Sequence, residues 1–189
     1  MKIMSVFGTR PEIIRLSRIF ELLDNNFDHV MVNTSQNFTH ELNSVFFDEM
    51  KIRKPDYDMK VNTKEYAKEV ADVIIKAEKL LKKEKPDILL ILGDTNSGLS
   101  AIPAAYQGIK IAHLEAGMRS YDPRMPEEKN RVMIDHLSTV LLPYTQYSRE
   151  NLIRENIHPS KIYVVGNPII EVIQHYLPKI EKSRILESL

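Results

Sequence analysis

Short apolar segments alternate with amphipathic segments along this chain. Seven of the apolar segments predict strands, because they are rich in Ile, Val and Leu and are bounded by turn-forming or charged residues. These strands are expected at residues 3–8, 29–34, 57–61, 88–92, 109–114, 139–142 and 162–165. The segment 88–92 is apolar throughout, which is typical of a strand that is covered on both faces.

Between the strands, apolar residues recur every three or four positions, which predicts helices. The helices are expected at residues 9–23, 38–50, 64–83, 95–107, 126–137, 146–155 and 169–177. Thr9 and Glu12 match a capping box at the start of the first helix, and Pro11 is tolerated in a first turn. Pro103 lies inside the fourth helix and predicts a kink there.

This alternation predicts the fold class. Such repeats form an α/β, Rossmann-like domain, with a mostly parallel sheet and helices on both faces joined by right-handed crossovers. We expect residues 1–168 to form this domain. Residues 169–189 are expected to form a connector helix towards a C-terminal domain that the chain lacks, with a charged tail from Pro178 that packs on nothing.

The composition narrows the range of partners. The 26 basic and 26 acidic residues cancel, so no nucleic-acid partner is expected. Cysteine is absent, which excludes disulfides and Cys-based metal sites and suits a cytoplasmic location. No apolar segment approaches the roughly 20 residues of a membrane span, so no membrane partner is expected.

Three carboxylates lie where predicted strands or loops end. Asp94 follows Gly93 after a strand, Glu115 ends the next strand, and Glu127 lies in the first turn of a helix. The carboxyl ends of parallel strands face the ligand crevice, and converging carboxyl groups are suited to proton transfer. Purely structural roles remain open for two of them. Asp94 could cap a helix, and Glu127 could interact only with the dipole at a helix N-terminus. Glu115 needs a partner or a crevice, since a carboxylate at the end of a buried strand is otherwise costly.

Polar residues near these carboxylates suggest a binding site for an anion. Gly8 permits a close backbone approach, Thr9 precedes a helix N-terminus, and Arg10 could contact a phosphate or carboxylate. The alternative is a plain capped turn with Arg10 in solvent. Asn130 and Arg131, one turn into the fifth helix, could face the same crevice.

Other chemistries find no support in the sequence. The dinucleotide fingerprint is incomplete, so no nicotinamide cofactor is expected, and no ligand spacing suggests a metal site. His113 lies inside a predicted strand and is expected to pack or pair in the core. His136, near a helix C-terminus, is expected to interact with the helix dipole.

Five motifs occur in a fixed order along the chain. They are Phe-Gly-Thr-Arg-Pro-Glu at 7–12, Leu-Gly-Asp-Thr at 92–95, His-Leu-Glu-Ala-Gly-Met-Arg at 113–119, Met-Pro-Glu-Glu-Lys-Asn-Arg at 125–131 and Gly-Asn-Pro at 166–168. Over nearly its whole length the chain thereby resembles the non-hydrolysing UDP-N-acetylglucosamine 2-epimerases. The resemblance implies the two-domain glycosyltransferase-B-like fold, in which the nucleotide sugar lies between two Rossmann-like halves. This chain would be the N-terminal half.

The resemblance also implies a reaction. UDP-GlcNAc and UDP-ManNAc would be interconverted by proton removal at C2, elimination of UDP to give 2-acetamidoglucal, and re-addition of UDP with protonation from the other face. Asp94, Glu115 and Glu127 match the acid and base carboxylates, and Arg10 matches an arginine close to the nucleotide. The implied partners are the UDP-sugar, the C-terminal domain and, as a further option, a second copy of the chain. No cofactor is implied, and the enzyme would serve cytoplasmic polysaccharide biosynthesis.

Two departures from the family leave alternatives open. Family members are roughly twice as long and their second half supplies most contacts to uridine and diphosphate, so this chain alone is expected to bind weakly and turn over little. Segments 93–97 and 100–103 resemble the branch that epimerises UDP-2-acetamido-2,6-dideoxy sugars, an alternative substrate. Segment 120–126 differs from the Pro-rich aromatic loop of the enzymes that act on UDP-N-acetylglucosamine. A glycosyltransferase half and a non-catalytic nucleotide-sugar-binding domain are further alternatives. Three carboxylates favour proton transfer over glycosyl transfer.

Overall fold

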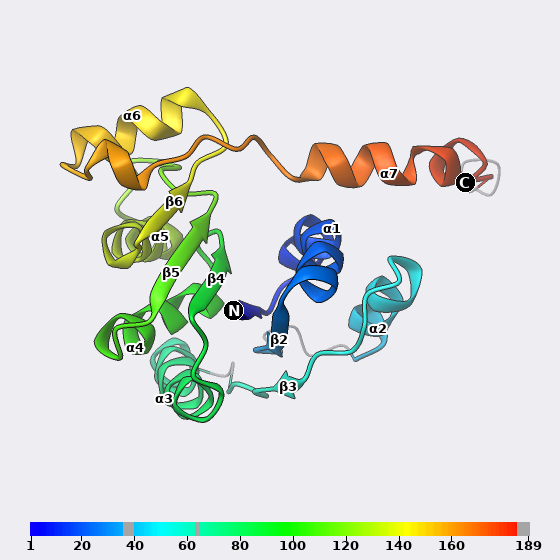
Figure 1. Ribbon diagram of the computed structural model, residues 1–189, viewed down its shortest axis with the longest axis horizontal. Helices are drawn as coiled ribbons and strands as arrows, with labels where there is room; N and C mark the ends of the chain where they lie inside the picture. Colours follow the sequence, from blue (N-terminus) through cyan, green and yellow to red (C-terminus); the bar gives the residue numbers. More distant parts are fainter. Residues whose placement is uncertain (36–39, 63–64, 185–189) are drawn as a thin grey trace.

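The computed structural model describes residues 1–35, 40–62 and 65–184, and within them six parallel strands form one sheet (Figure 1). The strand order is β3-β2-β1-β4-β5-β6, and each neighbouring pair is parallel. The strands are β1 (Lys2–Phe7), β2 (Asp28–Asn33), β3 (Tyr57–Asp58), β4 (Ile88–Leu92), β5 (Lys110–Leu114) and β6 (Val140–Leu142). The predicted α/β Rossmann-like sheet is confirmed.

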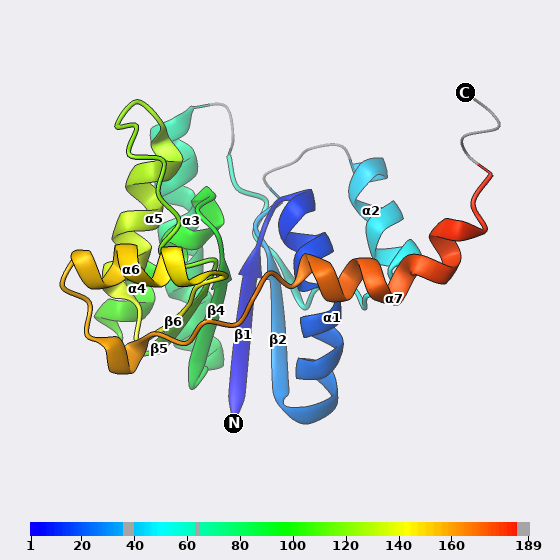
Figure 2. The ribbon, with the colours of Figure 1, turned by 90° about the horizontal axis from the view of Figure 1, so that it is seen from above.

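The seventh predicted strand, at residues 162–165, is wrong. Ile162 forms an isolated bridge with Leu141, and the amides of Tyr163 and Val165 donate to the carbonyls of Leu141 and Pro143 at 2.9 and 3.0 Å. The segment therefore follows the edge of β6 only briefly. It then crosses the molecule to reach the last helix (Figure 2), so it cannot continue the sheet.

Seven α-helices and two short 3₁₀-helices lie between or after the strands in the described part of the chain. They are α1 (Arg10–Asn26), α2 (His40–Glu49), α3 (Tyr66–Glu84), η1 (Asn96–Ser100), α4 (Ala101–Tyr106), α5 (Pro126–Leu137), α6 (Gln146–Arg154), η2 (Pro159–Lys161) and α7 (Ile169–Glu181). The single helix predicted at 95–107 is thus divided into η1 and α4. Pro103 does not kink it, because this residue lies in the first turn of α4, where a missing N–H costs little.

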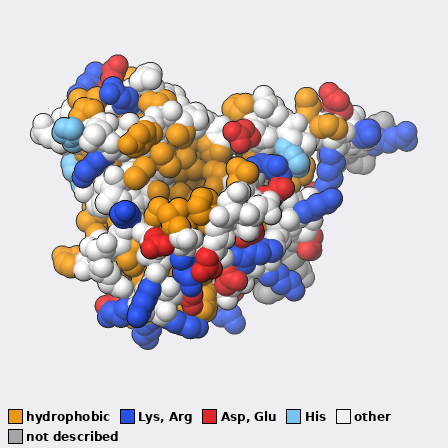
Figure 3. Space-filling model, in the orientation of Figure 1, with side chains coloured by type: hydrophobic (Ala, Val, Ile, Leu, Met, Phe, Trp, Pro, Cys, Tyr) orange, Lys and Arg blue, Asp and Glu red, His pale blue; other side chains and the backbone are white. Residues whose placement is uncertain are grey.

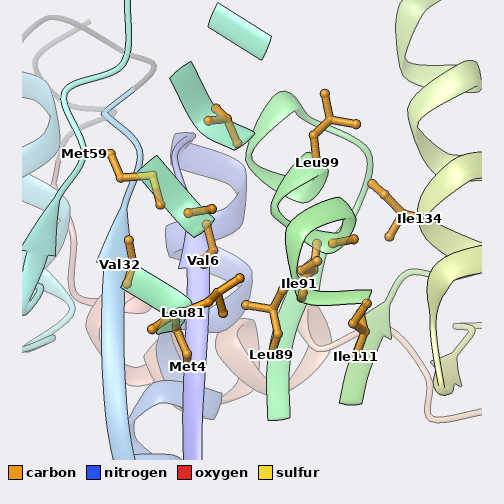
Figure 4. Packing of buried hydrophobic residues seen from close by; sticks show 14 of the residues in the cluster. Met4, Val6, Val32, Met59, Leu81, Leu89, Ile91, Leu99, Ile111 and Ile134 are labelled. Atoms are coloured by element: carbon orange, nitrogen blue, oxygen red, sulfur yellow. The ribbon is translucent and has the colours of Figure 1, made fainter. Parts of the chain in front are cut away.

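Both faces of the sheet are covered, because alternate residues of each buried strand point to opposite faces. On one face Val6, Leu89 and Ile91 pack with side chains of α3, η1 and α5 (Figure 4). On the other face, Phe7 and Met31 pack with α1, which supplies Ile13, Leu16 and Phe20. Burial of one such aliphatic or aromatic side chain contributes about 1.5–3 kcal/mol, so the two cores fix the sheet between its helices.

The last helix, α7, differs from its prediction. It continues through Pro178 to Glu181, and it lies against α1 (Figure 2). Tyr176 donates its hydroxyl to the carbonyl of Met50 at 2.9 Å, and Lys179 pairs with Glu49 at 3.4 Å. The expectation that the tail from Pro178 packs on nothing is therefore wrong at its start, because tertiary contacts hold this helix where its own hydrogen bonding is interrupted. Residues 185–189 lie outside the described residues, and a domain boundary at 168 stays a prediction.

The surface carries charged side chains around a smaller apolar area. Figure 3 shows hydrophobic side chains gathered in the middle of one face, between α6 and α1, with charged side chains around them. Exposed apolar residues of the segment that crosses this region include Tyr163, Val164 and Val165. Among the described residues, no helix is both long enough and apolar enough to span a bilayer.

One glycine after β5 is required by a close packing contact. Gly117 has a φ of +76°, and a Cβ there would overlap the carbonyl oxygen of Ser148 on α6. Gly108 has a similar φ of +71°, but a Cβ there would meet nothing within 4 Å. These two glycines therefore separate the effect of backbone conformation from the effect of packing.

We predict that Gly117→Ala lowers the free energy of unfolding by about 3 kcal/mol or more, since strain and a clash combine. The matched control Gly108→Ala should cost only about 1 kcal/mol, the cost of a left-handed conformation. Urea unfolding followed by circular dichroism measures both. Equal losses in the two variants would show that α6 does not pack closely on the turn after β5.

Candidate functional site

Three turns meet at the carboxyl edge of the sheet, after β1, β4 and β5. The strand order reverses between β1 and β4, and such a switch point opens a crevice in a parallel sheet. The amide of Gly93, after β4, donates to the carbonyl of Leu114 at 2.9 Å. A Cβ on Gly93 would lie 3.7 Å from Oε1 of Glu115, so the turns that carry Asp94 and Glu115 are direct neighbours.

The buried carboxylate of Glu12 connects the first two turns. Its Oε2 accepts hydrogen bonds from the amides of Gly8 and Thr9 at 2.9 and 2.7 Å. Its Oε1 accepts from the hydroxyls of Thr95 and Ser97 at 2.9 and 2.6 Å. The expected capping interaction of Glu12 with Thr9 is thus present, and Glu12 also reaches the turn after β4. Because Glu12 occupies the amides of Gly8 and Thr9, these two N–H groups are not free for a ligand.

Glu115 is held by an arginine that the sequence reasoning missed. The carboxylate pairs with Arg15 of α1, and its side chain is 11% exposed. Its φ of +74° lies in the left-handed region, which is uncommon for a non-glycine residue. Arg15 is three positions after Glu12 on the same face of α1, which is the one signal in the sequence that could have identified it.

Tyr144, just beyond β6, lies beside this ion pair. Burial raises the pKa of Tyr144 to about 12, although the nearby Arg15 acts in the opposite direction. Its hydroxyl is buried and has no hydrogen-bond partner among the described residues. Tyr144 therefore places a buried, neutral hydroxyl next to the carboxylate and guanidinium of the site.

The predicted residues Asp94, Asn130 and Arg131 come together. Arg131 of α5 pairs with Asp94, and the side-chain Nδ2 of Asn130 donates to the backbone carbonyl of Asp94 at 3.0 Å. Asp94 does not cap a helix, since the residue at the N-cap of η1 is Thr95. The Nε of Arg131 is buried and has no hydrogen-bond partner within the described part of the chain.

Of the two adjacent glutamates at the start of α5, the one that faces inward is Glu128. It pairs with Arg131 at 3.2 Å and accepts the amides of Ser120 and Tyr121 at 2.9 and 3.0 Å. Burial alone would raise the pKa of Glu128, but these amide hydrogen bonds and Arg131 lower it below its ordinary value. Glu128 thereby holds the loop before α5 in place. Sequence reasoning gave it no such role.

Two predicted residues remain in solvent. Glu127 is exposed and makes no hydrogen bond or ion pair with the described residues, so its carboxylate is not brought onto Asp94 or Glu115. Arg10 is also exposed at the first turn of α1, and no described side chain pairs with it. Arg10 is therefore a cation at the edge of the crevice that is still available to an anion.

The arrangement is suited to proton transfer near an anion. Asp94 and Glu115 each have an arginine partner from a different helix, so two carboxylates and two guanidinium groups meet at this edge of the sheet. Among the described residues, no group of three or more His, Asp or Glu side chains is placed to hold a metal ion. His113, expected in the core, is buried and paired there, and His136 contacts Glu155 at 3.3 Å.

Comparison with known proteins gives the family. The family model described as UDP-N-acetylglucosamine 2-epimerase matches residues 21–188. A UDP-N-acetylglucosamine 2-epimerase of Methanocaldococcus jannaschii is 40% identical over 185 residues, which cover 97% of this chain and 50% of that protein. The chain thus spans about half the length of the relatives that it matches.

Solved structures agree with this assignment. A Rickettsia bellii UDP-N-acetylglucosamine 2-epimerase is 46% identical and superposes with a TM-score of 0.94, over all of this chain and 50% of that one. The Methanocaldococcus jannaschii UDP-GlcNAc 2-epimerase, solved with UDP-GlcNAc and UDP, is 38% identical with a TM-score of 0.94, and the match covers 52% of it. A galactosyltransferase at 18% identity and a TM-score of 0.64 shares the fold alone, over 88% of this chain and 45% of that one. The chain therefore has the architecture of one half of a glycosyltransferase-B-like fold, and it belongs to the UDP-N-acetylglucosamine 2-epimerase family.

Proposed function

We propose that this chain is the N-terminal half of a non-hydrolysing UDP-N-acetylglucosamine 2-epimerase, which interconverts UDP-GlcNAc and UDP-ManNAc. One observation carries the proposal. Asp94 and Glu115 lie on adjacent turns at the switch point of the sheet, each paired with an arginine, next to the uncommitted Arg10. This arrangement combines groups that can move a proton with a cation that can hold a phosphate.

The reaction requires a proton to leave and return at C2. One carboxylate takes the C2 proton while the bond between C1 and the UDP oxygen breaks, which gives 2-acetamidoglucal and UDP. The UDP oxygen then bonds to C1 again, and a second carboxylate protonates C2 from the other face. We assign these acid and base roles to Asp94, Glu115 and Glu127. Glu127 would have to turn towards the sugar from its exposed position.

Substrate binding is assigned to the residues around these carboxylates. Arg10 and Arg131 would contact the diphosphate or the sugar, since the Nε of Arg131 is buried and unpartnered among the described residues. Asn130 would hold the Asp94 turn in place. Because their amides are committed to Glu12, Gly8 and Thr9 would act through close approach of the backbone rather than through those N–H groups.

The remaining part of the site is proposed to come from elsewhere. The relatives are about twice the length of this chain, and we propose that residues 1–168 form one wall of the crevice and residues 169–189 lead to the domain that forms the other. No cofactor beyond the substrate is needed. A homodimer, a cytoplasmic location and a role in polysaccharide biosynthesis stay predictions.

Two alternatives remain beside this proposal. The substrate could be a UDP-2-acetamido-2,6-dideoxy sugar, because segments 93–97 and 100–103 resemble that branch and segment 120–126 differs from the loop of the enzymes that act on UDP-N-acetylglucosamine. A non-catalytic nucleotide-sugar-binding domain would explain a crevice with only part of its contacts. A binding experiment with both sugar nucleotides tests the first alternative. A comparison of binding with turnover tests the second.

We predict that the 189-residue protein binds UDP-GlcNAc weakly, with a Kd of about 1 mM, which corresponds to about −4 kcal/mol. Proton NMR in D₂O with the sugar nucleotide detects both binding, as broadened uridine signals, and reaction, as deuterium at C2 or free UDP. Slow or absent deuterium exchange at C2, together with clearly broadened uridine signals, would fit a protein that carries one half of the substrate-binding site. Absence of binding to UDP-GlcNAc, to the dideoxy sugar and to UDP would contradict the proposal.

Glu115→Gln is predicted to lower epimerisation by at least about 100-fold, since removal of a general acid or base costs 10² to 10⁴ in rate. The variant is assayed in this chain fused to the second half of the Methanocaldococcus jannaschii relative. Glu150→Gln on the exposed face of α6 makes the same change of charge away from the site and should keep full activity. Near-full activity of Glu115→Gln would show that this carboxylate is not an acid or base.

Arg10→Ala is predicted to weaken UDP binding about 10-fold or more, because a charge-assisted hydrogen bond contributes about 1.5–3 kcal/mol. Calorimetric or NMR titration with UDP measures this loss. The control is Arg154→Ala, which removes the same charge from an exposed position that pairs only with Glu150 at 3.6 Å in the described chain. If both variants lost affinity equally, the effect would come from net charge and not from contact with the nucleotide.

A further inference from the structure

A buried cluster of charged side chains lies directly behind the crevice. It contains His113 of β5, Asp135 of α5 and Arg119 of the loop after β5, and their side chains are 0%, 0% and 1% exposed. Arg119 also forms two hydrogen bonds of 2.6 Å with Glu155, at the end of α6. None of these four residues takes part in the proposed reaction.

Asp135 is an ionised carboxylate that can only accept hydrogen bonds. Burial alone would raise the pKa of Asp135, but the charges of His113 and Arg119 hold it below its ordinary value. Its Oδ2 accepts from Nη1 of Arg119 at 2.8 Å and from the amide of Gly117 at 3.1 Å. Its Oδ1 lies 2.7 Å from Nδ1 of His113, so this ring nitrogen must carry a proton and donate.

The other ring nitrogen of His113 meets a second acceptor. Nε2 lies 2.8 Å from the carbonyl oxygen of Gly93, which has no proton to give. A neutral imidazole has one donor and one acceptor, so it could satisfy only one of these two contacts. Both contacts are satisfied only if both ring nitrogens are protonated.

The charge balance of the cluster favours the same state. With a protonated His113, two cations face the two carboxylates of Asp135 and Glu155. With a neutral His113, Arg119 alone would face both carboxylates, away from water, where unpaired charge is costly. Of the other described titratable groups, His136 approaches this cluster, at 3.3 Å from Glu155 and on its exposed side.

We propose that His113 is an imidazolium that positions the Gly93–Asp94 turn. Its ring holds the Gly93 carbonyl, and Gly93 has a φ of +74° that directs the chain into Asp94. His113 also lies two residues before Glu115 on β5, so one ring fixes the spacing between the two carboxylate-bearing turns. The charge state of His113 does not depend on the proposed function. The importance of this spacing for proton transfer does rest on the proposed function.

Imidazole NMR tests the charge state in the 189-residue protein. Nitrogen-15 spectra are recorded at about pH 8, where an unperturbed histidine side chain, with a pKa of about 6.5, is mostly neutral. We expect both ring nitrogens of His113 to carry protons, with the signals assigned by their loss in His113→Gln. A free histidine side chain in the same buffer serves as the reference for the neutral form. A single protonated nitrogen in His113 would overturn the proposal.

Backbone relaxation tests the positioning role. A glutamine can donate to Gly93 or to Asp135 but presents an acceptor to the other, so His113→Gln should increase fast motion at the amides of Gly93 and Asp94. The control Ile111→Val removes one methylene from the same strand, which costs about 1 kcal/mol, and leaves the charged cluster intact. Unchanged relaxation in His113→Gln, or an equal change in both variants, would overturn the role.

UDP-GlcNAc titration of the same proteins separates this inference from the proposed function. We expect His113→Gln to bind several-fold more weakly than the wild type and than Ile111→Val. Failure of the wild type to bind would count against the epimerase function, while the ring protonation and the relaxation results would still decide the state and role of His113. Equal binding in all three proteins would limit His113 to holding the turn, with no effect on the substrate.

Discussion

A single buried carboxylate, Glu12, holds together the two turns on which the crevice depends. Its four hydrogen bonds connect the turn after β1 with the turn after β4, on either side of the switch point of the sheet. No cation pairs with Glu12 among the described residues, so amides and hydroxyls alone compensate its burial. Loss of any one of these hydrogen bonds to a charged group would cost about 1.5–3 kcal/mol. This cost keeps the two turns together in the absence of a ligand.

The parallel topology explains why the remaining residues converge at this edge. Every strand ends at the same edge, so residues far apart in the chain become neighbours without a long loop. The two arginine–carboxylate pairs then connect the turns to helices on opposite faces, Arg15 from α1 and Arg131 from α5. The crevice is therefore supported from both layers of helices. A shift of either helix would change the position of one carboxylate relative to the other.

The sequence predicts the elements whose signal is local. Continuous apolar strands such as 88–92 and the long helix α3 were found, because periodicity alone specifies them. The strand predicted at 162–165 failed, because whether an apolar segment joins a sheet edge depends on where the chain must go next. The end of α7 failed for a related reason, since contacts of Tyr176 and Lys179 with the body of the protein carry the helix past Pro178.

In the site, too, some features follow from the local sequence and others depend on tertiary packing. Asp94 and Glu115 could be found because residues after buried parallel strands face a crevice, whichever protein they occur in. Their partners could not, because which side of a helix faces inward depends on its rotation in the packed structure. Two adjacent glutamates begin α5, and nothing local indicates that Glu128 faces the loop while Glu127 faces solvent. Arg15 is similarly one of several polar residues on α1 until Glu115 is placed beside it.

Most charged groups of the crevice are already paired with one another. Arg15 and Arg131 are already paired with Glu115 and Asp94, and Glu128 takes a further share of Arg131. The amides of Gly8 and Thr9 at the start of α1 are taken by Glu12. Arg10 is thus the one site cation within the described chain that has no anionic partner, whereas a diphosphate leaving group carries at least two negative charges. A single unpaired guanidinium within the described chain cannot balance those charges, which is the physical reason for the weak UDP-GlcNAc binding predicted for this chain.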